Sequence, residues 1–328
     1  MVSSAVVTVI VAGRDIATLA PAALDSLLAQ TEPRFRAVLI DDGSIDETGA
    51  IFRRYADTDA RFHAIRHPDS LGLGAARNHG LSLVDTEYVA FLDADDVMRP
   101  EALEHMVASL ESSGSEMAVG TYVRLREVDG AWVCGDVQPW VRASVTPARA
   151  GVTLTDHPAV VGNIVAWSKV SRHALWTRTG VRFPESVLYE DQVVAQRLYA
   201  AAQGIDLLDE VVVEWRIRND GSSITQREAD PRVLADCVEQ MAAGLDVLRE
   251  TSAEATAART TQIRRMDLPR LAGIFDLAPE SRALLGTFAR TLKPTAEDRA
   301  LLTQSPANPN NPDAPMIGEV YDRVVAWV

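Results

Sequence analysis

Acidic residues follow two apolar runs of this chain, each time in a short turn. Asp41-Asp42-Gly43-Ser44 follows the apolar run at 37–40, and Asp93-Ala94-Asp95-Asp96 follows the run at 88–92. Such runs predict buried parallel strands, and open α/β sheets bind their ligands at the carboxyl ends of these strands. Because clustered carboxylates suit a divalent cation and a nucleotide diphosphate, the two turns predict a site for both.

Asp93 and Asp95 stand two residues apart in the second turn. In a tight turn both carboxylates can face one hard divalent cation, Mg²⁺ or Mn²⁺, which would also bind diphosphate oxygens. The alternative is a solvated turn that caps a helix at Pro100. A net charge of -14 would repel a polyanionic ligand. A bound cation would offset this repulsion, so we expect the metal at Asp95 and Asp93.

The first turn and the segment around Arg77 are expected to face the same ligand. A carboxylate at Asp41 or Asp42 can accept the ring N–H of a pyrimidine or the hydroxyls of a ribose, although an acid here can also cap a helix. Glycines flank Ala76-Arg77-Asn78 on both sides, which indicates close backbone approach. Arg77 is equally suited to pair with Asp41 or Asp93.

Two later motifs add a base and a phosphate clamp. Glu190-Asp191 opens a predicted helix at 188–202, and the helix dipole favours acids in the first turn. Two acids in a row leave a candidate general base, but the spacing does not choose between them. Arg216-Ile217-Arg218 could grip phosphate oxygens through guanidinium groups, or it could be a solvated strand end.

The elements that would position these residues alternate between strand and helix. The patterns predict strands at 6–12, 36–40, 61–66, 87–92 and 116–126, with helices at 19–30, 44–55, 73–84 and 100–112. Ser44 and Glu47 predict a capping box for the second helix, and 138–155 is expected to be a loop. This repetition predicts an α/β fold, a mostly parallel sheet with helices on both faces.

From residue 207 onward the chain no longer alternates between predicted strands and helices. A strand is predicted at 207–218, and from Pro231 the apolar period is helical. A Pro/Asn-rich linker at 305–312 precedes a terminal amphipathic segment. We therefore expect a catalytic domain at 1–228, a helical extension at 229–304, and the linker with the terminal segment at 305–328.

The composition narrows the class of protein. The chain is 47% hydrophobic and strongly acidic, so it is expected to be globular and not to bind nucleic acid. Its two cysteines, Cys134 and Cys237, are too few for a disulfide framework, so a reducing cytoplasm is expected. No stretch has the roughly 18 apolar residues of a membrane helix, and peripheral attachment at the inner face of the membrane stays open. The six histidines lack metal-ligand spacing and are taken as surface or helix residues.

Over about residues 5–225 the ordered motifs resemble those of family 2 glycosyltransferases of the GT-A fold. The motifs that carry the resemblance are Asp41-Asp42-Gly43-Ser44-Ile45-Asp46-Glu47-Thr48, the segment from Gly72 to Gly80, Phe91-Leu92-Asp93-Ala94-Asp95-Asp96, Tyr189-Glu190-Asp191, and Trp215-Arg216-Ile217-Arg218 followed by Gly221-Ser222. The last motif resembles bacterial members that decorate wall polymers, and the helical tail resembles the segment after the transferase domain of teichoic-acid and polyol-phosphate enzymes.

The resemblance assigns roles to individual residues. Asp191, with Glu190 beside it, would be the catalytic base, and Asp95 with Asp93 would hold the metal. The nucleotide-binding residues would be Ala12, Arg14, Asp41, Asp42, Ser70, Arg77, Asp93, Arg218, Ser222 and Ser223. Two positions depart from the family pattern: Ala12-Gly13-Arg14-Asp15 stands where Pro-x-Tyr-Asn is usual, and Ser70 stands where Asn is usual.

The expected activity is that of a metal-dependent, inverting glycosyltransferase. The donor would be a nucleotide-diphospho-sugar, with a UDP-sugar favoured, and the acceptor a polyhydroxylated, even polyanionic, cell-wall or surface polymer such as teichoic acid. Two alternatives stay open: a nucleotidyltransferase or sugar-nucleotide pyrophosphorylase, and a non-catalytic nucleotide-sugar-binding module of a larger synthase. A homo-oligomer or a fusion to a further domain is also open.

Overall fold

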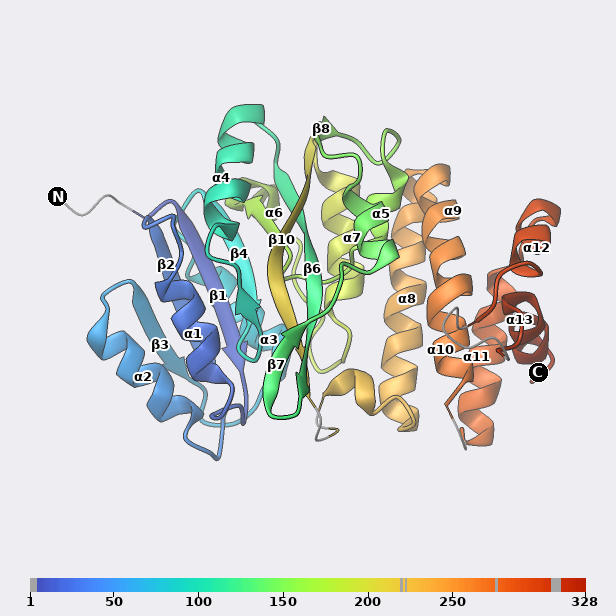
Figure 1. The fold of residues 1–328 in the computed structure, drawn as a ribbon, viewed down its shortest axis with the longest axis horizontal. Helices are drawn as coiled ribbons and strands as arrows, with labels where there is room; N and C mark the ends of the chain where they lie inside the picture. The colour runs from blue at the N-terminus through green and yellow to red at the C-terminus, as the bar shows by residue number, and fades with distance from the viewer. Residues whose placement is uncertain (1–4, 219–220, 222, 275–276, 308–313) are drawn as a thin grey trace. The chain divides into compact units, whose positions relative to one another are not determined.

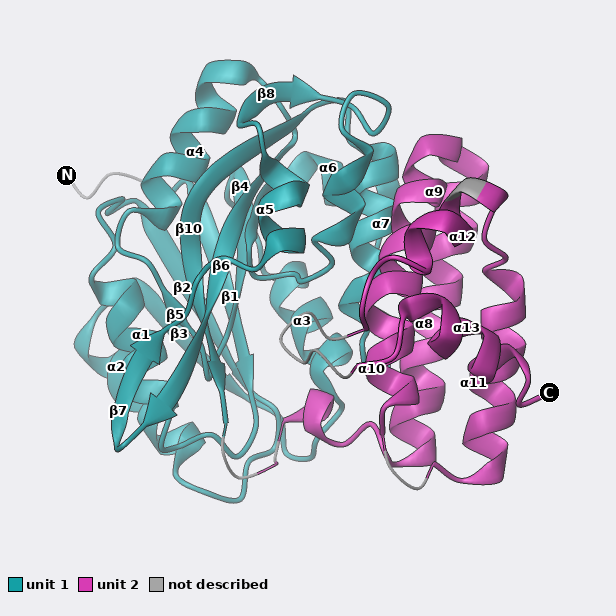
Figure 2. Ribbon diagram, turned by 45° about the vertical axis from the view of Figure 1, so that its right-hand side comes forward, with its two compact units in different colours: residues 1–219 teal, residues 220–328 magenta. Residues whose placement is uncertain are grey.

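The computed structural model describes residues 5–218, 221, 223–274, 277–307 and 314–328. The chain divides into two compact units, residues 1–219 and residues 220–328 (Figure 2). The first is an α/β unit built on one large sheet, and the second is helical. The predicted fold class is thereby confirmed.

The sheet of the first unit has the strand order β3-β2-β1-β4-β9-β6-β10-β5, with β7 paired to β6 and β8 paired to β10. The long strands β3, β2, β1, β4, β6 and β10 all run in one direction, and the short β5, β7, β8 and β9 run against them. The strands are β1 (Val7–Gly13), β2 (Phe35–Asp41), β3 (Phe62–Arg66), β4 (Tyr88–Asp93), β5 (Val97–Met98), β6 (Met117–Val128), β7 (Ala131–Cys134), β8 (Arg149–Val152), β9 (Lys169–Arg172) and β10 (Ile205–Ile217).

Helices cover both faces of this sheet. They are α1 (Ala20–Leu28), α2 (Thr48–Thr58), α3 (Leu73–Ser82), α4 (Ala102–Ser113), α5 (Pro139–Val145), α6 (His173–Thr179) and α7 (Asp191–Ala201), with a 3₁₀ turn η1 (Pro158–Gly162). Right-handed crossovers place α1 and α2 on one face and α3 on the opposite face (Figure 1). On the α3 side, Ala76 packs into a buried cluster with Ala12, Val38 and Ile40.

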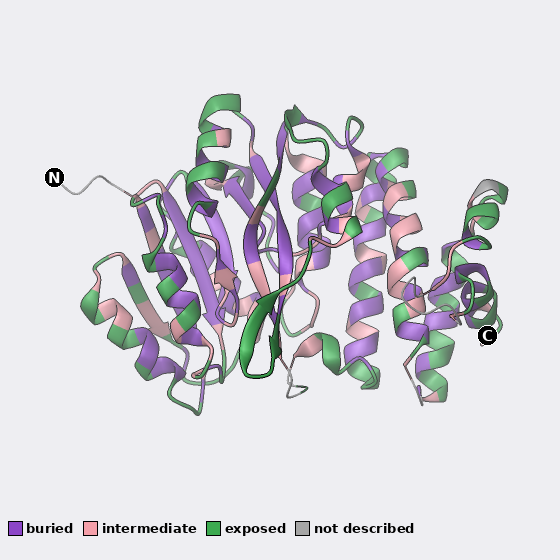
Figure 3. Ribbon diagram, in the orientation of Figure 1, coloured by how far each residue is buried: buried purple, intermediate pink, exposed green. Residues whose placement is uncertain are grey.

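The central strands are buried because helices shield them on both sides. Strand β1 is buried from Val7 to Ala12, as Figure 3 shows in purple. Its last residues set the geometry of the sheet edge: Gly13 is in register with Asp41 on β2, and Ala12 is in register with Asp93 on β4. The two acidic turns therefore lie on either side of the end of β1.

Two local predictions are wrong. Helix α2 begins at Thr48 after Glu47 and not at Ser44, because the Ser44 hydroxyl accepts a hydrogen bond from the backbone of residue 15 instead of capping the helix. Residues 138–155, expected to be a loop, contain α5 and β8. Helix α5 is too short for a helical period to stand out in the sequence, and β8 forms because it pairs with β10.

In the described part of the second unit the regular elements are helices, joined by turns and loops, with one isolated β-bridge between Pro306 and Met316. Its helices are α8 (Pro231–Thr251), α9 (Ala253–Gln262), α10 (Leu268–Ala272), α11 (Pro279–Thr291), α12 (Ala296–Leu302) and α13 (Ile317–Val325), with a 3₁₀ turn η2 (Ile224–Gln226) and a π-helical turn η3 (Ile263–Asp267). Asp230 caps α8 by accepting from the Arg232 backbone N–H at 2.9 Å. Among the described residues of the whole chain, no helix combines the length and apolarity that crossing a membrane requires.

Candidate active site

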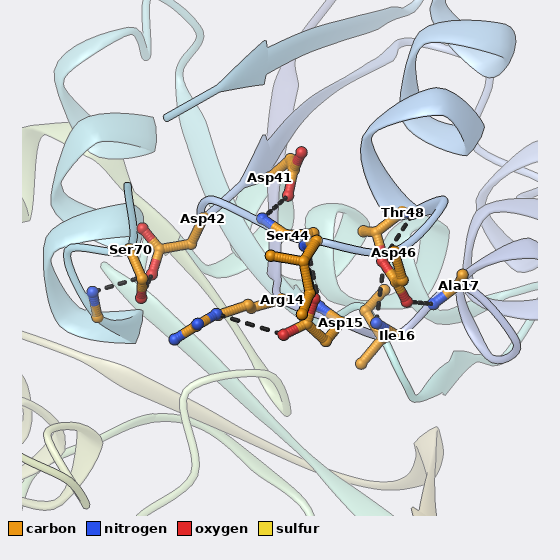
Figure 4. Close-up of polar contacts among 12 residues, drawn as sticks. Arg14, Asp15, Ile16, Ala17, Asp41, Asp42, Ser44, Asp46, Thr48 and Ser70 are labelled. Atoms are coloured by element: carbon orange, nitrogen blue, oxygen red, sulfur yellow. Dashed lines mark hydrogen bonds and ion pairs between the residues drawn. The ribbon is translucent and has the colours of Figure 1, made fainter. Parts of the chain in front are cut away.

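Three side chains of the 41–48 motif hold the loop that follows β1 (Figure 4). Ser44 Oγ accepts the backbone N–H of residue 15 at 3.0 Å, Thr48 Oγ1 that of residue 16 at 2.9 Å, and Asp46 Oδ2 that of residue 17 at 3.0 Å. This spacing of short polar residues therefore fixes the backbone beside Arg14, at the carboxyl edge of the sheet.

Asp42 holds a second loop at the same edge. Its carboxylate accepts hydrogen bonds from the Ser70 hydroxyl at 2.7 Å and from the backbone N–H groups of Leu71 and Gly72, both at 2.9 Å. His67 Nδ1 lies 2.8 Å from Asp42 Oδ1. Burial alone would raise the pKa of Asp42, but these hydrogen bonds lower it below its ordinary value. Asp42 therefore holds the residues that precede α3 in place.

Asp41 is more deeply enclosed, with only 1% of its surface exposed. Its Oδ1 accepts the Ser44 backbone N–H at 2.9 Å, and its Oδ2 has no hydrogen-bond partner, although Arg66 Nε lies 3.4 Å away. A Cβ at Gly49 would lie 2.3 Å from Oδ2, so only glycine lets α2 pass this carboxylate. This oxygen therefore faces α2 and Arg66 inside the protein.

Arg77 joins the two halves of the site. This buried guanidinium on α3 donates to Asp93 Oδ1 and to Glu190 Oε1, each at 2.5 Å. The ring of Phe183 lies 5.3 Å from the guanidinium carbon, and the two carboxylates raise the pKa of Arg77 against the effect of burial. Of the two pairings left open by the sequence, the structure has the one with Asp93, and Arg77 connects the β4 turn to the residues that open α7.

The segment before α7 is fixed by other residues of α3. Asn78 exchanges two hydrogen bonds of 2.9 Å with the backbone of Phe183. A Cβ at Gly74 would lie 2.1 Å from the Pro184 carbonyl oxygen, so a glycine is required for this close approach. The segment reaches α7 through Tyr189, whose φ of 59° is in the left-handed region. The Gly-x-x-Arg-Asn spacing therefore places Glu190 and Asp191.

Asp93, Asp95 and Asp96 bring one carboxylate oxygen each within 4.8 Å of one another. Burial raises the pKa of Asp93, while Arg77 acts to lower it and Asp95 to raise it further. Burial also raises the pKa of Asp96 well above its usual value, and the charges of Asp95 and Asp93 add to that rise. Crowded carboxylates of this kind are the donor set of Mg²⁺ and Mn²⁺. A divalent cation would relieve their mutual repulsion, so the residues fit one.

Two arginines from the end of β10 reach this turn. The Arg218 guanidinium donates to Asp95 Oδ2, with the Nε contact at 2.9 Å. The backbone N–H of Arg216 donates to Asp96 Oδ1 at 2.8 Å, and its buried side chain donates to the Leu19 carbonyl oxygen. Arg216 therefore supports the turn, whereas Arg218 is the guanidinium beside the carboxylates.

The structure separates the two acids that the sequence left equivalent. The Glu190 carboxylate is held by Arg77, and burial raises its pKa to about 7. Asp191 makes none of these ion pairs and lines a small cavity. Burial also raises the pKa of Asp191, while Arg77 and Lys169 act to lower it and Asp93 to raise it.

The remaining predicted residues are placed as follows. Ala12 is the last residue but one of β1, which ends between the two acidic turns, and Arg14 follows the strand with half of its side chain exposed. Ser70 lies in the loop held by Asp42. Ser222 is outside the described residues, and Ser223 belongs to the second unit, where it caps η2.

Sequence reasoning missed two groups. His67 and His79, taken as surface or helix residues, form a chain in which His67 Nε2 lies 2.8 Å from His79 Nδ1 while His67 also contacts Asp42. Lys169, on β9, is buried beside Asp191. No spacing signals the histidine chain, but the near absence of lysine from the sequence could have drawn attention to Lys169.

The architecture and the acidic edge define a GT-A-type α/β unit. Solved structures share this fold: TarS residues 1–349 of S. aureus, determined in complex with UDP, has a TM-score of 0.69 at 20% identity, covering 98% of this chain and 87% of that one. A mannosyltransferase from Pyrobaculum calidifontis, determined with GDP-Man and Mn²⁺, has a TM-score of 0.61 at 17% identity, covering 99% and 86%.

Sequence comparison gives a match in the same class of protein. Residues 7–139 match the model of "Glycosyl transferase family 2", so this part of the chain is similar to family 2 glycosyltransferase domains. Glycosyltransferase GlyA of Streptococcus pneumoniae is 27% identical over 71% of this chain and 34% of GlyA. TarS, a poly(ribitol-phosphate) beta-N-acetylglucosaminyltransferase of Staphylococcus aureus, is 25% identical over 63% of this chain and 35% of TarS. The chain thus spans about a third of these two relatives.

Replacing Arg77 with Met should destabilise the first unit. The change leaves the buried Glu190 carboxylate and the partly buried Asp93 carboxylate without the Arg77 counter-charge, and breaking a buried pair typically costs about 3–5 kcal/mol. The loss should be larger at pH 8 than at pH 5, because Glu190 has its pKa near 7 and protonation at low pH removes the unpaired charge. Urea unfolding at both pH values measures this. Arg249→Met, which breaks an exposed pair with Asp246, should have little effect, and an equal loss in the two variants would contradict the prediction.

Proposed function

We propose that this protein is a metal-dependent, inverting glycosyltransferase that moves a sugar from a nucleotide-diphospho-sugar to an acceptor hydroxyl. The observation that carries the proposal is the placement of Arg77, which ties the Asp93 turn to Glu190 and so brings Asp191 to the acidic edge of the sheet. A carboxylate cluster suited to a diphosphate-bound cation and a separate carboxylate suited to a base are what such a transfer needs.

The loops after β1 and before α3 would bind the nucleotide. Their backbones are preorganised by Ser44, Asp46 and Thr48 on one side and by Asp42 on the other. Asp41, at the end of β2, is proposed to contact the base, and Arg14 has an exposed guanidinium that could lie against it.

Asp95, with Asp93, would hold Mg²⁺ or Mn²⁺. The bound cation would neutralise the charge that develops on the departing diphosphate. Support comes from the three converging carboxylates and from the mannosyltransferase with the same fold, which was determined with Mn²⁺. Arg218, beside Asp95, supplies a guanidinium suited to the same diphosphate oxygens.

Asp191 would act as the general base. Its carboxylate takes the proton of the acceptor hydroxyl while that oxygen forms a bond to the anomeric carbon. The bond from this carbon to the diphosphate oxygen breaks, and its electron pair leaves with the nucleotide. A single displacement from the opposite face inverts the configuration. The raised pKa of Asp191 makes it a stronger proton acceptor than an ordinary exposed aspartate.

The relatives suggest the substrates. TarS is named for N-acetylglucosamine transfer to poly(ribitol-phosphate) and has been determined with UDP and with UDP-GlcNAc. We therefore propose a UDP-sugar as donor and a polyol-phosphate or other cell-wall polymer as acceptor. Cytoplasmic action, free or attached peripherally to the membrane, fits a nucleotide-activated donor.

A ligand screen tests this function. Thermal-shift measurements with UDP-GlcNAc, UDP-glucose and GDP-mannose, each with and without Mn²⁺, should show a metal-dependent rise in Tm for one donor. That donor should then be hydrolysed slowly to the nucleoside diphosphate. Release of pyrophosphate from a nucleoside triphosphate and a sugar phosphate would instead identify a nucleotidyltransferase. Binding without any turnover, even with polymer acceptors, would identify a non-catalytic module.

A further inference from the structure

Lys169 is an unusual residue for this chain. Of the 32 basic residues only Lys169 and Lys293 are lysine, so arginine is used almost everywhere else. Lys169 is 6% exposed, and its ammonium group donates to Asn163 Oδ1 at 2.8 Å and to the carbonyl oxygen of Val165, with Ser168 Oγ at 3.5 Å. Three oxygens around one nitrogen suit the tetrahedral ammonium of lysine and not the planar fork of arginine.

The surroundings of Lys169 connect it to the proposed base. Lys169 and Asp191 line the same cavity of about 20 Å³. The cavity walls are largely apolar and include the rings of Phe91, Trp176 and Phe183, whose centroids lie 5.3–5.8 Å apart. Charges facing such an apolar space interact more strongly than charges in water.

We propose that Lys169 is a positioning residue that holds a positive charge behind Asp191 and keeps this carboxylate ionised for proton abstraction. The inference rests on the proposed function, because it gives Lys169 a role only through the base. Lys169 does not touch the substrate in this account. It acts across the cavity, held in place by the loop at 163–168.

The electrostatics around Asp191 give the sign of the effect. From α3, Arg77 lowers the pKa of Asp191; from β4, Asp93 raises it; from β9, Lys169 lowers it. Glu190 precedes Asp191 in the chain and has its own pKa raised by it. Burial lowers the pKa of Lys169 to about 7, against the opposing effect of Asp191, so the amine is charged on the acidic side of neutrality. Loss of that charge should therefore raise the pKa of Asp191.

A purely structural role is the alternative explanation. The ammonium also satisfies Asn163 and the Val165 carbonyl, and it lies 5.6 Å from the ring centre of Tyr199. If Lys169 only supports this loop, replacing it would lower stability and overall activity without moving the pH dependence of the reaction. The pH profile therefore distinguishes the two roles.

The test is the pH profile of kcat/KM for Lys169→Met, measured with the donor and metal found by the ligand screen. The acidic limb should move to higher pH by about one unit, because Asp191 then needs a higher pH to lose its proton. Lys293→Met changes the only other lysine, which is exposed in the second unit, and should leave the profile unchanged. Unfolding in urea monitors the stability of both variants.

Lys169→Gln keeps a hydrogen-bond donor for the 163–168 loop while removing the charge, and it carries the test if Lys169→Met does not fold. The same upward shift is expected. An acidic limb that stays at its wild-type position in the folded uncharged variants would overturn the role of Lys169, while wild-type transfer and its loss in Asp191→Asn would leave the proposed function intact. Absence of transfer in the wild type would instead count against the proposed function itself.

Discussion

Replacing Asp191 with Asn should reduce sugar transfer by about 10²- to 10⁴-fold, the usual contribution of a general base. The amide has the shape of the carboxylate but cannot take the proton of the acceptor hydroxyl. Because Asp191 opens α7 on the cavity side and is not part of the Arg77 ion pairs, the donor site should remain assembled. We therefore expect initial rates of transfer to show a large loss of kcat, while titration calorimetry shows that the Kd for the donor is unchanged.

Glu190→Gln is the matched comparison for that variant. Glu190 is bonded to Arg77 and its pKa is already near 7, so neutralising it removes one partner of a buried arginine and does not remove the base. We expect a smaller loss of kcat than in Asp191→Asn, together with lower stability. A reversed order, with Glu190→Gln inactive and Asp191→Asn active, would assign the base to Glu190.

Replacing Asp95 with Asn should lower transfer by about 10²-fold or more, because a catalytic metal ion contributes several kcal/mol of charge stabilisation. The substitution removes one charge from the cluster of Asp93, Asp95 and Asp96 and weakens the contact of Asp95 with the Arg218 guanidinium. Manganese affinity, followed by its paramagnetic effect on water relaxation, should fall in parallel. For the wild type, EDTA should abolish transfer and added Mn²⁺ should restore it.

Asp246→Asn serves as the control for a lost surface carboxylate. Asp246 is largely exposed on α8 and pairs only with the neighbouring Arg249 among the contacts described, so its loss should change neither metal affinity nor rate. Full transfer by Asp95→Asn in the presence of EDTA would refute the metal-dependent account.

Local sequence patterns were sufficient to predict most of the strands and helices of the first unit. The apolar runs ending at Asp41 and Asp93 predicted strands β2 and β4, since parallel strands buried on both faces leave nearly continuous apolar segments. The local patterns failed where contacts between distant segments decide the structure. Ser44 is a residue type that often caps helices, but its hydroxyl accepts a hydrogen bond from the loop after β1. Strand β8 forms by pairing with β10, which lies far from it in the sequence.

The sequence by itself determined which charged groups stand at strand ends and helix starts, because these positions follow from periodicities and turns within a few residues. Only the tertiary structure decided which of these groups form ion pairs and hydrogen bonds with one another. Arg77 forms ion pairs with Asp93 and Glu190. Asp42 accepts hydrogen bonds from backbone N–H groups, and Lys169 lines the same cavity as Asp191. Such pairings join residues far apart in the chain, and their strength depends on burial, which no local spacing reports.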